Sequence, residues 1–148
     1  YEAKKKDFSQ VLWLDVNHEY IEEVGTMNIF FVFENEIATP SLDGTILSGG
    51  VRDSILTLLK ASKKPIVERK IKISEVFKAA ENKTLKEVFG TGTAALISPV
   101  GELSSKNKKI VINQNQMGPV AIELYQELTG IQHGTRPDTF GWLKPVLK

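Results

Sequence analysis

Cysteine is absent from the 148-residue chain. This absence excludes disulfide bonds, thiol catalysis and metal sites built on cysteine. Histidine is scarce as well, since only His18 and His133 occur, and neither has an acidic or histidine partner at metal-binding spacing. We therefore expect no metal site, and a chain with no need of an oxidising compartment fits a cytoplasmic location.

Long hydrophobic runs and an excess of one charge are also missing. No segment approaches the roughly 20 apolar residues that a membrane-spanning helix needs. Lys and Arg number 19 against 18 Asp and Glu, a net charge of +1, so bulk charge gives no reason to expect nucleic acid or anionic lipid as a partner. Apolar residues make up 41% of the chain, which is typical of a globular domain.

Short apolar runs alternate with segments of helical periodicity along the chain. The predicted strands are 10–16, 28–33, 37–39, 66–73, 94–100 and 109–112, and the predicted helices are 50–62, 74–80, one that begins at Thr84, and 119–128 closed by Gly130. The absence of any repeat of 20 to 50 residues excludes solenoids and propellers. We expect one α/β or α+β domain, built on a mixed sheet or irregular barrel with flanking helices.

Three short segments are candidate binding sites, and the first contains Glu23. This glutamate precedes the most apolar predicted strand, Asn28–Phe33. A carboxylate near buried sheet needs a cation or a protonated nitrogen as its partner, because burial without one is costly. Taken alone, the pattern favours a hydrogen-bonded surface acid, and the alternative is an acid directed at a ligand.

The second candidate, Ser48–Arg52, places two glycines ahead of a predicted helix. Free N–H groups at a helix N-terminus bind phosphate, and glycine allows close approach. A glycine pair by itself more often marks a structural turn. Arg52 could pair with Asp53, with Asp43 or with a bound anion, and the sequence leaves these open.

The third candidate is Gly90–Ala94, whose consecutive amides and threonine hydroxyls could surround an anion. In isolation, a bulged turn is the alternative interpretation of this segment.

These segments occur in an order that resembles the C-terminal half of the branched-chain aminotransferases. The residues that carry the resemblance are EVGTMNIFF, TPSLDGTIL followed by GxxRDSIL, FGTGTAALISPVGEL, GPVAIELYQELTGIQHG and FGW. They extend from about Val11 to Trp142, and several linked motifs in fixed order are far more specific than any one. The resemblance implies the fold of the D-amino acid transaminases, with residues 1–148 as the large domain that binds pyridoxal 5'-phosphate.

The resemblance also implies roles for individual residues in binding that cofactor. Glu23 matches the acid that keeps the pyridine nitrogen protonated, so that the ring can act as an electron sink. Leu47 matches the residue that packs against the ring. The backbone N–H groups of Gly50 and Val51, together with the hydroxyl of Thr93, match the groups that bind the phosphate.

On the substrate side, Thr26 and Ala94 match positions that line the carboxylate site. The lysine that bonds the cofactor lies in the family further upstream of EVGTMN than this chain reaches. We therefore expect that lysine and a small N-terminal domain to precede Tyr1, and we expect this chain alone to be inactive.

Two features depart from the family pattern. Members usually read PGVTR where this chain has Ser48–Arg52, so the proline and the threonine hydroxyl are missing while the backbone N–H groups remain. Some relatives carry CxxC where this chain has Ala95–Ser98, so redox control through thiols is excluded here.

The implied activity of the full-length protein is transfer of the amino group of leucine, isoleucine or valine to 2-oxoglutarate, in a homodimeric enzyme of branched-chain amino acid biosynthesis. D-amino acid transaminases and aminodeoxychorismate lyases share the fold and are alternatives. A non-catalytic domain that binds a phosphorylated small molecule is an alternative of another class. A lysine in the preceding coding sequence would favour an enzyme.

Overall fold

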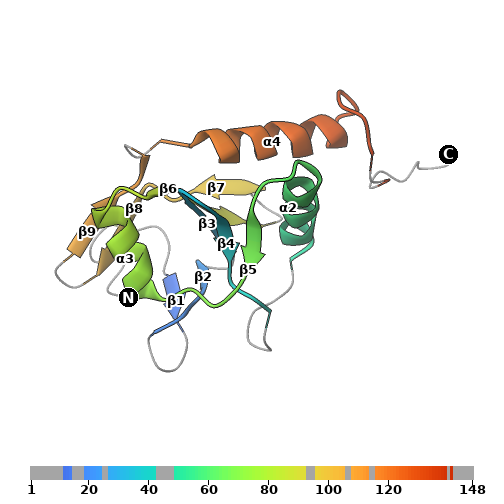
Figure 1. Ribbon diagram of the computed structural model, residues 1–148. Helices are drawn as coiled ribbons and strands as arrows, with labels where there is room; N and C mark the ends of the chain where they lie inside the picture. The colour runs from blue at the N-terminus through green and yellow to red at the C-terminus, as the bar shows by residue number, and fades with distance from the viewer. Residues whose placement is uncertain are drawn as a thin grey trace.

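The computed structural model describes residues 12–14, 19–24, 27–42, 49–92, 96–105, 108–113, 116–139 and 141. A five-stranded mixed sheet, with a helix or a hairpin packed on each face, forms the centre of the molecule (Figure 1). The predicted class, a mixed sheet with flanking helices, is confirmed. The strands in the described part of the chain form open sheets rather than a closed barrel, so the barrel stays a prediction.

The central sheet has the strand order β5-β4-β3-β6-β7. Its strands are β3 (Asn28–Phe33), β4 (Ile37–Thr39), β5 (Ile66–Glu68), β6 (Leu85–Thr91) and β7 (Ile97–Pro99). Only β4 and β5 are parallel, while the other neighbours are antiparallel. The central strand β3 is buried along almost its whole length, as its unbroken apolar run predicts.

Two small antiparallel sheets and three helices complete the described fold. The small sheets pair β1 (Leu12–Leu14) with β2 (Ile21–Val24) and β8 (Glu102–Ser105) with β9 (Lys108–Val111). The helices are α2 (Gly50–Ala61), α3 (Ile73–Glu81) and α4 (Pro119–Gln132). In Figure 1, α2 lies to the right of the central strands, α4 above them, and α3 with the β8–β9 hairpin to their left.

Alternation along β3 divides the core into two halves. Phe30 and Val32 face a cluster that includes Ile55 and Leu59 of α2 and Leu124 of α4. The intervening residues of β3 face a second cluster, whose members include Ile21, Val76, Leu103 and Ile112. The sheet is therefore covered on both faces, and functional groups can be reached only at its ends.

The helix predicted to begin at Thr84 is wrong, because Leu85–Thr91 is strand β6. This strand pairs with β3 along its whole length and is buried at nearly every position. The threonine that was predicted to cap a new helix instead donates its hydroxyl proton to Ala79 O, at the end of α3. Tertiary pairing with the most apolar strand outweighs a local capping pattern.

Two other predicted boundaries are also wrong. The strand predicted over 66–73 ends at Glu68, and α3 begins at Ile73 because Ile71 and Ile73 turn to make hydrogen bonds with β2 and Glu19. Helix α4 continues through Gly130 to Gln132. A Cβ atom at Gly130 would lie 2.7 Å from Arg136 Cδ, so this glycine serves packing, whereas Gly134, just beyond the helix end, adopts the left-handed region with φ 75°.

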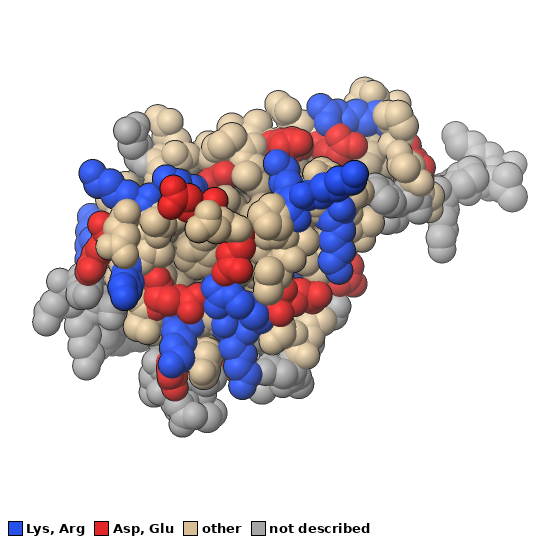
Figure 2. All heavy atoms as spheres, in the orientation of Figure 1, with Lys and Arg blue, Asp and Glu red and all other residues tan. Residues whose placement is uncertain are grey.

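Charged side chains of both signs alternate over the face that Figure 2 shows. One network joins Arg69 to Glu75 and Glu36 at 2.7 and 2.6 Å. The hydrogen bond with Glu75, followed by that with Glu36, raises the pKa of Arg69, against an opposing effect of burial. These pairs fasten the segment between β5 and α3 to the β3–β4 hairpin.

Candidate functional site

One end of the central sheet gathers residues from three distant parts of the chain. Strand β3 begins there with Asn28, which lies opposite Thr91 at the end of β6. Helix α2 also begins there, since a Cβ atom on Gly49 would lie 2.6 Å from Asn28 Oδ1. A Cβ atom on Gly92 would lie 3.2 Å from Met27 Cγ. We call Met27, Asn28, Gly49, Thr91 and Gly92 the α2 end of the sheet.

The α2 end of the sheet depends on its two glycines. At Gly49 any side chain would overlap the amide of Asn28, so only glycine lets the first turn of α2 approach β3 this closely. At Gly92 the contact with Met27 is tighter than an ordinary van der Waals contact but can be relieved by a flexible side chain. The sequence pattern of glycines here therefore has a packing reason, independent of any ligand.

The first turn of α2 has the properties of an anion site. Its N-cap is Gly49, a residue that has no side chain of its own to cap the helix start. Asp53 N–H bonds to Gly49 O at 3.1 Å, so the N–H groups of Gly50 and Val51 precede the hydrogen-bond ladder of the helix. Gly50 is exposed, and among the described residues no atom outside its chain neighbours and its own helix backbone lies within 4 Å of the position that its Cβ would take. Backbone N–H groups that face open space can donate hydrogen bonds to a phosphate.

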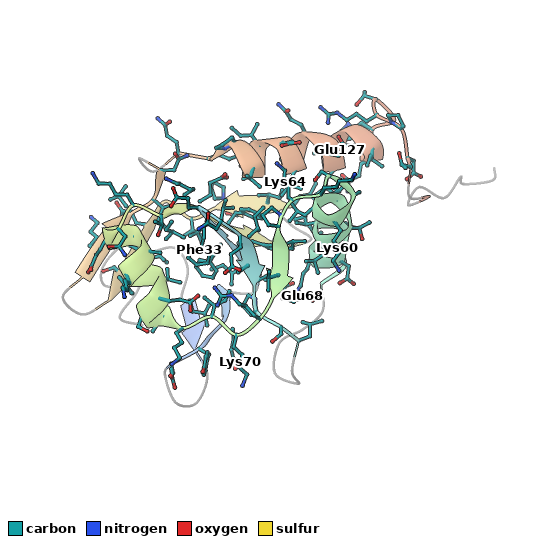
Figure 3. All side chains as sticks on the ribbon, in the orientation of Figure 1. Phe33, Lys60, Lys64, Glu68, Lys70 and Glu127 are labelled. Atoms are coloured by element: carbon teal, nitrogen blue, oxygen red, sulfur yellow. The ribbon has the colours of Figure 1, made fainter. Side chains whose placement is uncertain are left out.

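Arg52 fixes this helix start to the sheet. Its side chain is 1% exposed, and Nη2 donates to Pro40 O at 3.1 Å and to Glu68 Oε1 at 2.8 Å. Pro40 follows β4 and Glu68 ends β5, so one guanidinium joins α2 to two strands. Glu68 is labelled in Figure 3, on β5 beside α2. Of the partners that the sequence left open, Asp53 lies further away, at 3.8 Å from Nη1.

Two buried polar atoms in the described part of the chain have no hydrogen-bond partner, and both belong to this region. They are Arg52 Nε and Thr91 Oγ1. Buried donors and hydroxyls are nearly always satisfied in native proteins. Both atoms lie near the start of α2, so buried polar groups at this end of the sheet have no hydrogen-bond partner among the described residues.

The predicted site residues are only partly within the described chain. Gly50 and Val51 form the first turn of α2, as predicted. Glu23 lies in strand β2, opposite Trp13, and its side chain lies outside the described residues. The other predicted site residues, Thr26, Leu47, Thr93 and Ala94, also lie outside them. The roles of all these residues remain predictions.

The flanking residues nevertheless connect the three segments. Met27 follows Thr26 in the chain, Gly49 is two residues beyond Leu47, and Gly92 precedes Thr93. These three flanking positions belong to the α2 end of the sheet. Segments that are distant in sequence therefore meet at their described borders.

Sequence reasoning missed Asn28 and the pairing of Arg52 with Glu68, and it included Thr91 only as one of the threonines of the candidate segment Gly90–Ala94. A signal existed for Asn28, because it is the one amide in the otherwise apolar NIFFVF. Nothing in the sequence indicated Glu68, since its position beside Arg52 depends on the parallel pairing of β5 with β4.

The described residues contain neither a candidate metal site nor a candidate membrane-spanning helix. No group of three or more histidine, aspartate or glutamate side chains there could hold a metal ion. None of the helices found there combines the length and the apolar character that crossing a bilayer requires.

The family model and the relatives that this chain matches are all aminotransferases. A family model described as amino-transferase class IV matches residues 1–103. Branched-chain-amino-acid aminotransferase 2 of Bacillus subtilis (strain 168) is 52% identical over 145 residues, which are 97% of this chain and 40% of that protein. A probable branched-chain-amino-acid aminotransferase of Staphylococcus aureus (strain N315) is 50% identical over 147 residues, 99% of this chain and 41% of that protein. The chain thus spans less than half of these relatives.

Solved structures that resemble this chain are also branched-chain amino acid aminotransferases. The crystal structure of Escherichia coli branched-chain amino acid aminotransferase superposes with a TM-score of 0.82 at 30% identity, over 97% of this chain and 45% of that one. A T.th. branched-chain amino acid aminotransferase complexed with N-(5'-phosphopyridoxyl)-L-glutamate gives a TM-score of 0.78 at 27% identity, over 97% of this chain and 44% of that one.

Proposed function

Because the chain belongs to the class IV aminotransferases, we propose that it is the cofactor-binding large domain of a branched-chain amino acid aminotransferase. The full-length protein would use pyridoxal 5'-phosphate to transfer the amino group of leucine, isoleucine or valine to 2-oxoglutarate. A small N-terminal domain would precede this chain and carry the lysine that bonds the cofactor. The names of the relatives, and the phosphopyridoxyl compound in one solved neighbour, support this proposal.

The observation that carries the proposal is the fit of the α2 end of the sheet to a phosphate. The start of α2 offers the N–H groups of its first turn behind a glycine N-cap, Gly50 leaves the approach open, and a buried hydroxyl without a hydrogen-bond partner in the described chain belongs to Thr91, on the same face of the sheet. A dianion would satisfy these donors and interact favourably with the helix dipole. The departure from the family pattern at Ser48–Arg52 removes one hydroxyl but none of the backbone donors.

When bound, the cofactor supplies an electron sink for the electron pair released at the substrate α-carbon. In this proposal Gly50 and Val51 hold the phosphate through their N–H groups, with the Thr93 hydroxyl as a third donor. Glu23 holds a proton at the pyridine nitrogen, and Leu47 packs against the ring. Precise positioning by several weak contacts is itself a large part of catalysis.

The substrate side would be formed by Thr26 and Ala94, which we propose to orient the carboxylate. Thr26 directly precedes Met27, and Ala94 follows Gly92 by two residues, so both would lie near the phosphate-binding turn. We further propose that the full-length protein is a cytoplasmic homodimer, and that its large domain completes an irregular barrel.

The proposal is tested on the natural full-length protein. Leucine, isoleucine and valine should each donate an amino group to 2-oxoglutarate, whereas D-alanine should not. Activity with D-amino acids, or release of pyruvate from aminodeoxychorismate, would assign the chain to one of its alternatives. Binding of pyridoxal 5'-phosphate without any amino transfer would favour a non-catalytic domain.

Glu23 provides a second test. Glu23→Ala should lower kcat by roughly a hundredfold, the order expected for one electrostatic contact to a developing charge. KM for the amino acid should change much less, because Glu23 acts on the ring rather than on the substrate. Glu23→Gln, which keeps the size but not the charge, should behave like the alanine variant. Normal turnover in Glu23→Ala would remove Glu23 from the site.

A further inference from the structure

Thr91 carries a hydroxyl for which the described part of the chain provides no hydrogen-bond partner. The residue is 1% exposed, and its Oγ1 makes no hydrogen bond. Such a group destabilises the fold, because water no longer satisfies it and nothing in the protein replaces the water. When a native structure keeps such a buried, unsatisfied hydroxyl, we expect the hydroxyl to bind something other than the protein itself.

A second buried threonine shows that this sheet can satisfy a hydroxyl. Thr39 ends β4, is 0% exposed, and donates to Ile29 O at 2.7 Å. The two threonines have the same side chain, the same degree of burial and a place in the same sheet. They differ in that the hydroxyl of Thr39 is bonded while that of Thr91 is not.

The register of the sheet places Thr91 on the face that α2 covers. Its cross-strand neighbour Ile97 belongs to the same core half as Ile55 of α2. Its other neighbour is Asn28, whose Oδ1 lies next to the backbone of Gly49, at the start of α2. Thr91 therefore stands on the same side of the sheet as the first turn of α2, and at the same end.

Val51 offers no hydroxyl at the first turn of α2. We infer that Thr91 supplies a hydroxyl donor there and binds the same phosphate as the backbone of Gly50 and Val51. The inference rests on the proposed function, and it gives Thr91 a phosphate contact that the resemblance gave only to Thr93. A hydroxyl that donates to a phosphate oxygen makes a short, charge-assisted hydrogen bond.

Pyridoxamine 5'-phosphate and pyridoxamine are suitable probes, because neither can condense with a lysine and they differ by one phosphate. Their dissociation constants should be measured by calorimetry on the natural full-length apoprotein. Thr91→Val should weaken binding of pyridoxamine 5'-phosphate by about ten- to a hundredfold, as expected for one hydrogen bond to a charged group. It should leave the weak binding of pyridoxamine unchanged. Thr91→Ser, which keeps the hydroxyl, should bind the phosphorylated probe nearly as well as the wild type.

Thr39→Val is the matched control, and apoprotein stability is the second readout. Removal of a bonded hydroxyl should lower the melting temperature of Thr39→Val without changing its affinity for either probe. Removal of an unsatisfied hydroxyl should leave the melting temperature of Thr91→Val unchanged or raise it. A purely structural role for Thr91 would give the opposite pattern, with lower stability and unchanged affinity.

Val51→Thr tests whether the two positions supply the same donor. In this background Thr91→Val should weaken binding of pyridoxamine 5'-phosphate less than it does in the wild type, since one hydroxyl would replace the other.

The proposed cofactor site and the proposed role of Thr91 can fail separately. If the wild type bound both probes equally, no phosphate site would exist at α2, and the inference would fail together with the proposed cofactor site. If the wild type preferred the phosphorylated probe and Thr91→Val kept that preference in full, the inference alone would be overturned.

Discussion

The carboxylate of Glu87 occupies the space beside Gly118 so completely that a Cβ atom on Gly118 would overlap it. The same carboxylate accepts hydrogen bonds from the N–H groups of Val120 at 2.9 Å and Ala121 at 3.0 Å. A buried acid on β6 thus caps α4, which follows much later in the chain, and the glycine before that helix makes room for it. This contact attaches α4 to the sheet away from the α2 end.

Gly118→Ala should destabilise the protein by about 1–3 kcal/mol, the usual cost of an added methyl group in a packed site. Gly118 has φ −81°, which alanine adopts without strain, so the loss would come from the clash with Glu87. Urea unfolding followed by far-ultraviolet circular dichroism measures the change. Gly50→Ala is the control, because its Cβ would meet nothing within 4 Å, and it should be neutral or slightly stabilising. Equal stability of the two variants would contradict the packing argument.

Glu87→Ala should lower the free energy of unfolding by about 2–4 kcal/mol, because it removes a charged acceptor from two buried N–H groups. Hydrogen exchange should also become faster at the amides of Val120 and Ala121, while exchange in α2 stays unchanged. Glu123→Ala, an acid on the exposed side of α4, should change stability by less than about 0.5 kcal/mol. Unchanged protection of those two amides in Glu87→Ala would show that another group caps α4.

Arg52→Lys should destabilise the protein by about 1–3 kcal/mol although the charge is kept. Both hydrogen bonds, to Pro40 and to Glu68, come from Nη2 at the far end of the planar guanidinium, and a lysine ammonium group does not place its donors at that fixed position. Thermal unfolding measures the effect, and Lys60→Arg on the exposed side of the same helix should have almost none. If Arg52→Lys melted at the wild-type temperature, the guanidinium would not be what fastens α2 to the sheet.

The pKa of Lys72 is raised above its ordinary value of 10.5, chiefly by a hydrogen bond with Glu19 and then by the charge of that residue. A pKa that is higher in the folded than in the unfolded state stabilises the fold below the unfolded value. The contribution is lost as the pH rises through the folded value. The difference in stability between wild type and Lys72→Met should therefore be constant from about pH 7 to 9 and should shrink above about pH 10.5.

Unfolding in urea at a series of pH values measures that difference. In a Glu19→Gln background, where the main partner charge is absent and only the smaller effects of Tyr20 and Glu75 remain, the same comparison should show a smaller step. A difference that shrank already between about pH 7 and 9 would assign the effect to a group other than Lys72.

Local sequence patterns were sufficient for several elements. The unbroken apolar run Asn28–Phe33 predicted β3 with its observed bounds, and Ile37–Thr39 predicted β4. The spacing of Val51, Ile55, Leu58 and Leu59 predicted α2, and its predicted start at Gly50 is where the structure places it. These elements could be predicted because the signal for each lies within the element itself, in its periodicity and in the residue types at its ends.

Other features depended on partners that the local sequence does not contain. Leu85–Thr91 has the spacing of a helix start, yet it is a strand because β3 offers it a buried neighbour along its full length. Glu87 has no local partner in sequence, and its role appears only when α4 returns to the sheet. The pairing of Arg52 with Glu68 likewise exists only after β5 has aligned with β4.

The sequence by itself determined the family, the two-sided burial of β3 and the glycine-rich start of α2, since each is written in residues that are close together in the chain. Only the tertiary structure decided that Asn28, Gly49 and Thr91 meet at one end of the sheet, and that Thr91 is left there without a hydrogen-bond partner. The physical reason is that satisfaction of a buried polar group depends on every neighbour around it, and those neighbours come from strands and helices that are distant in sequence.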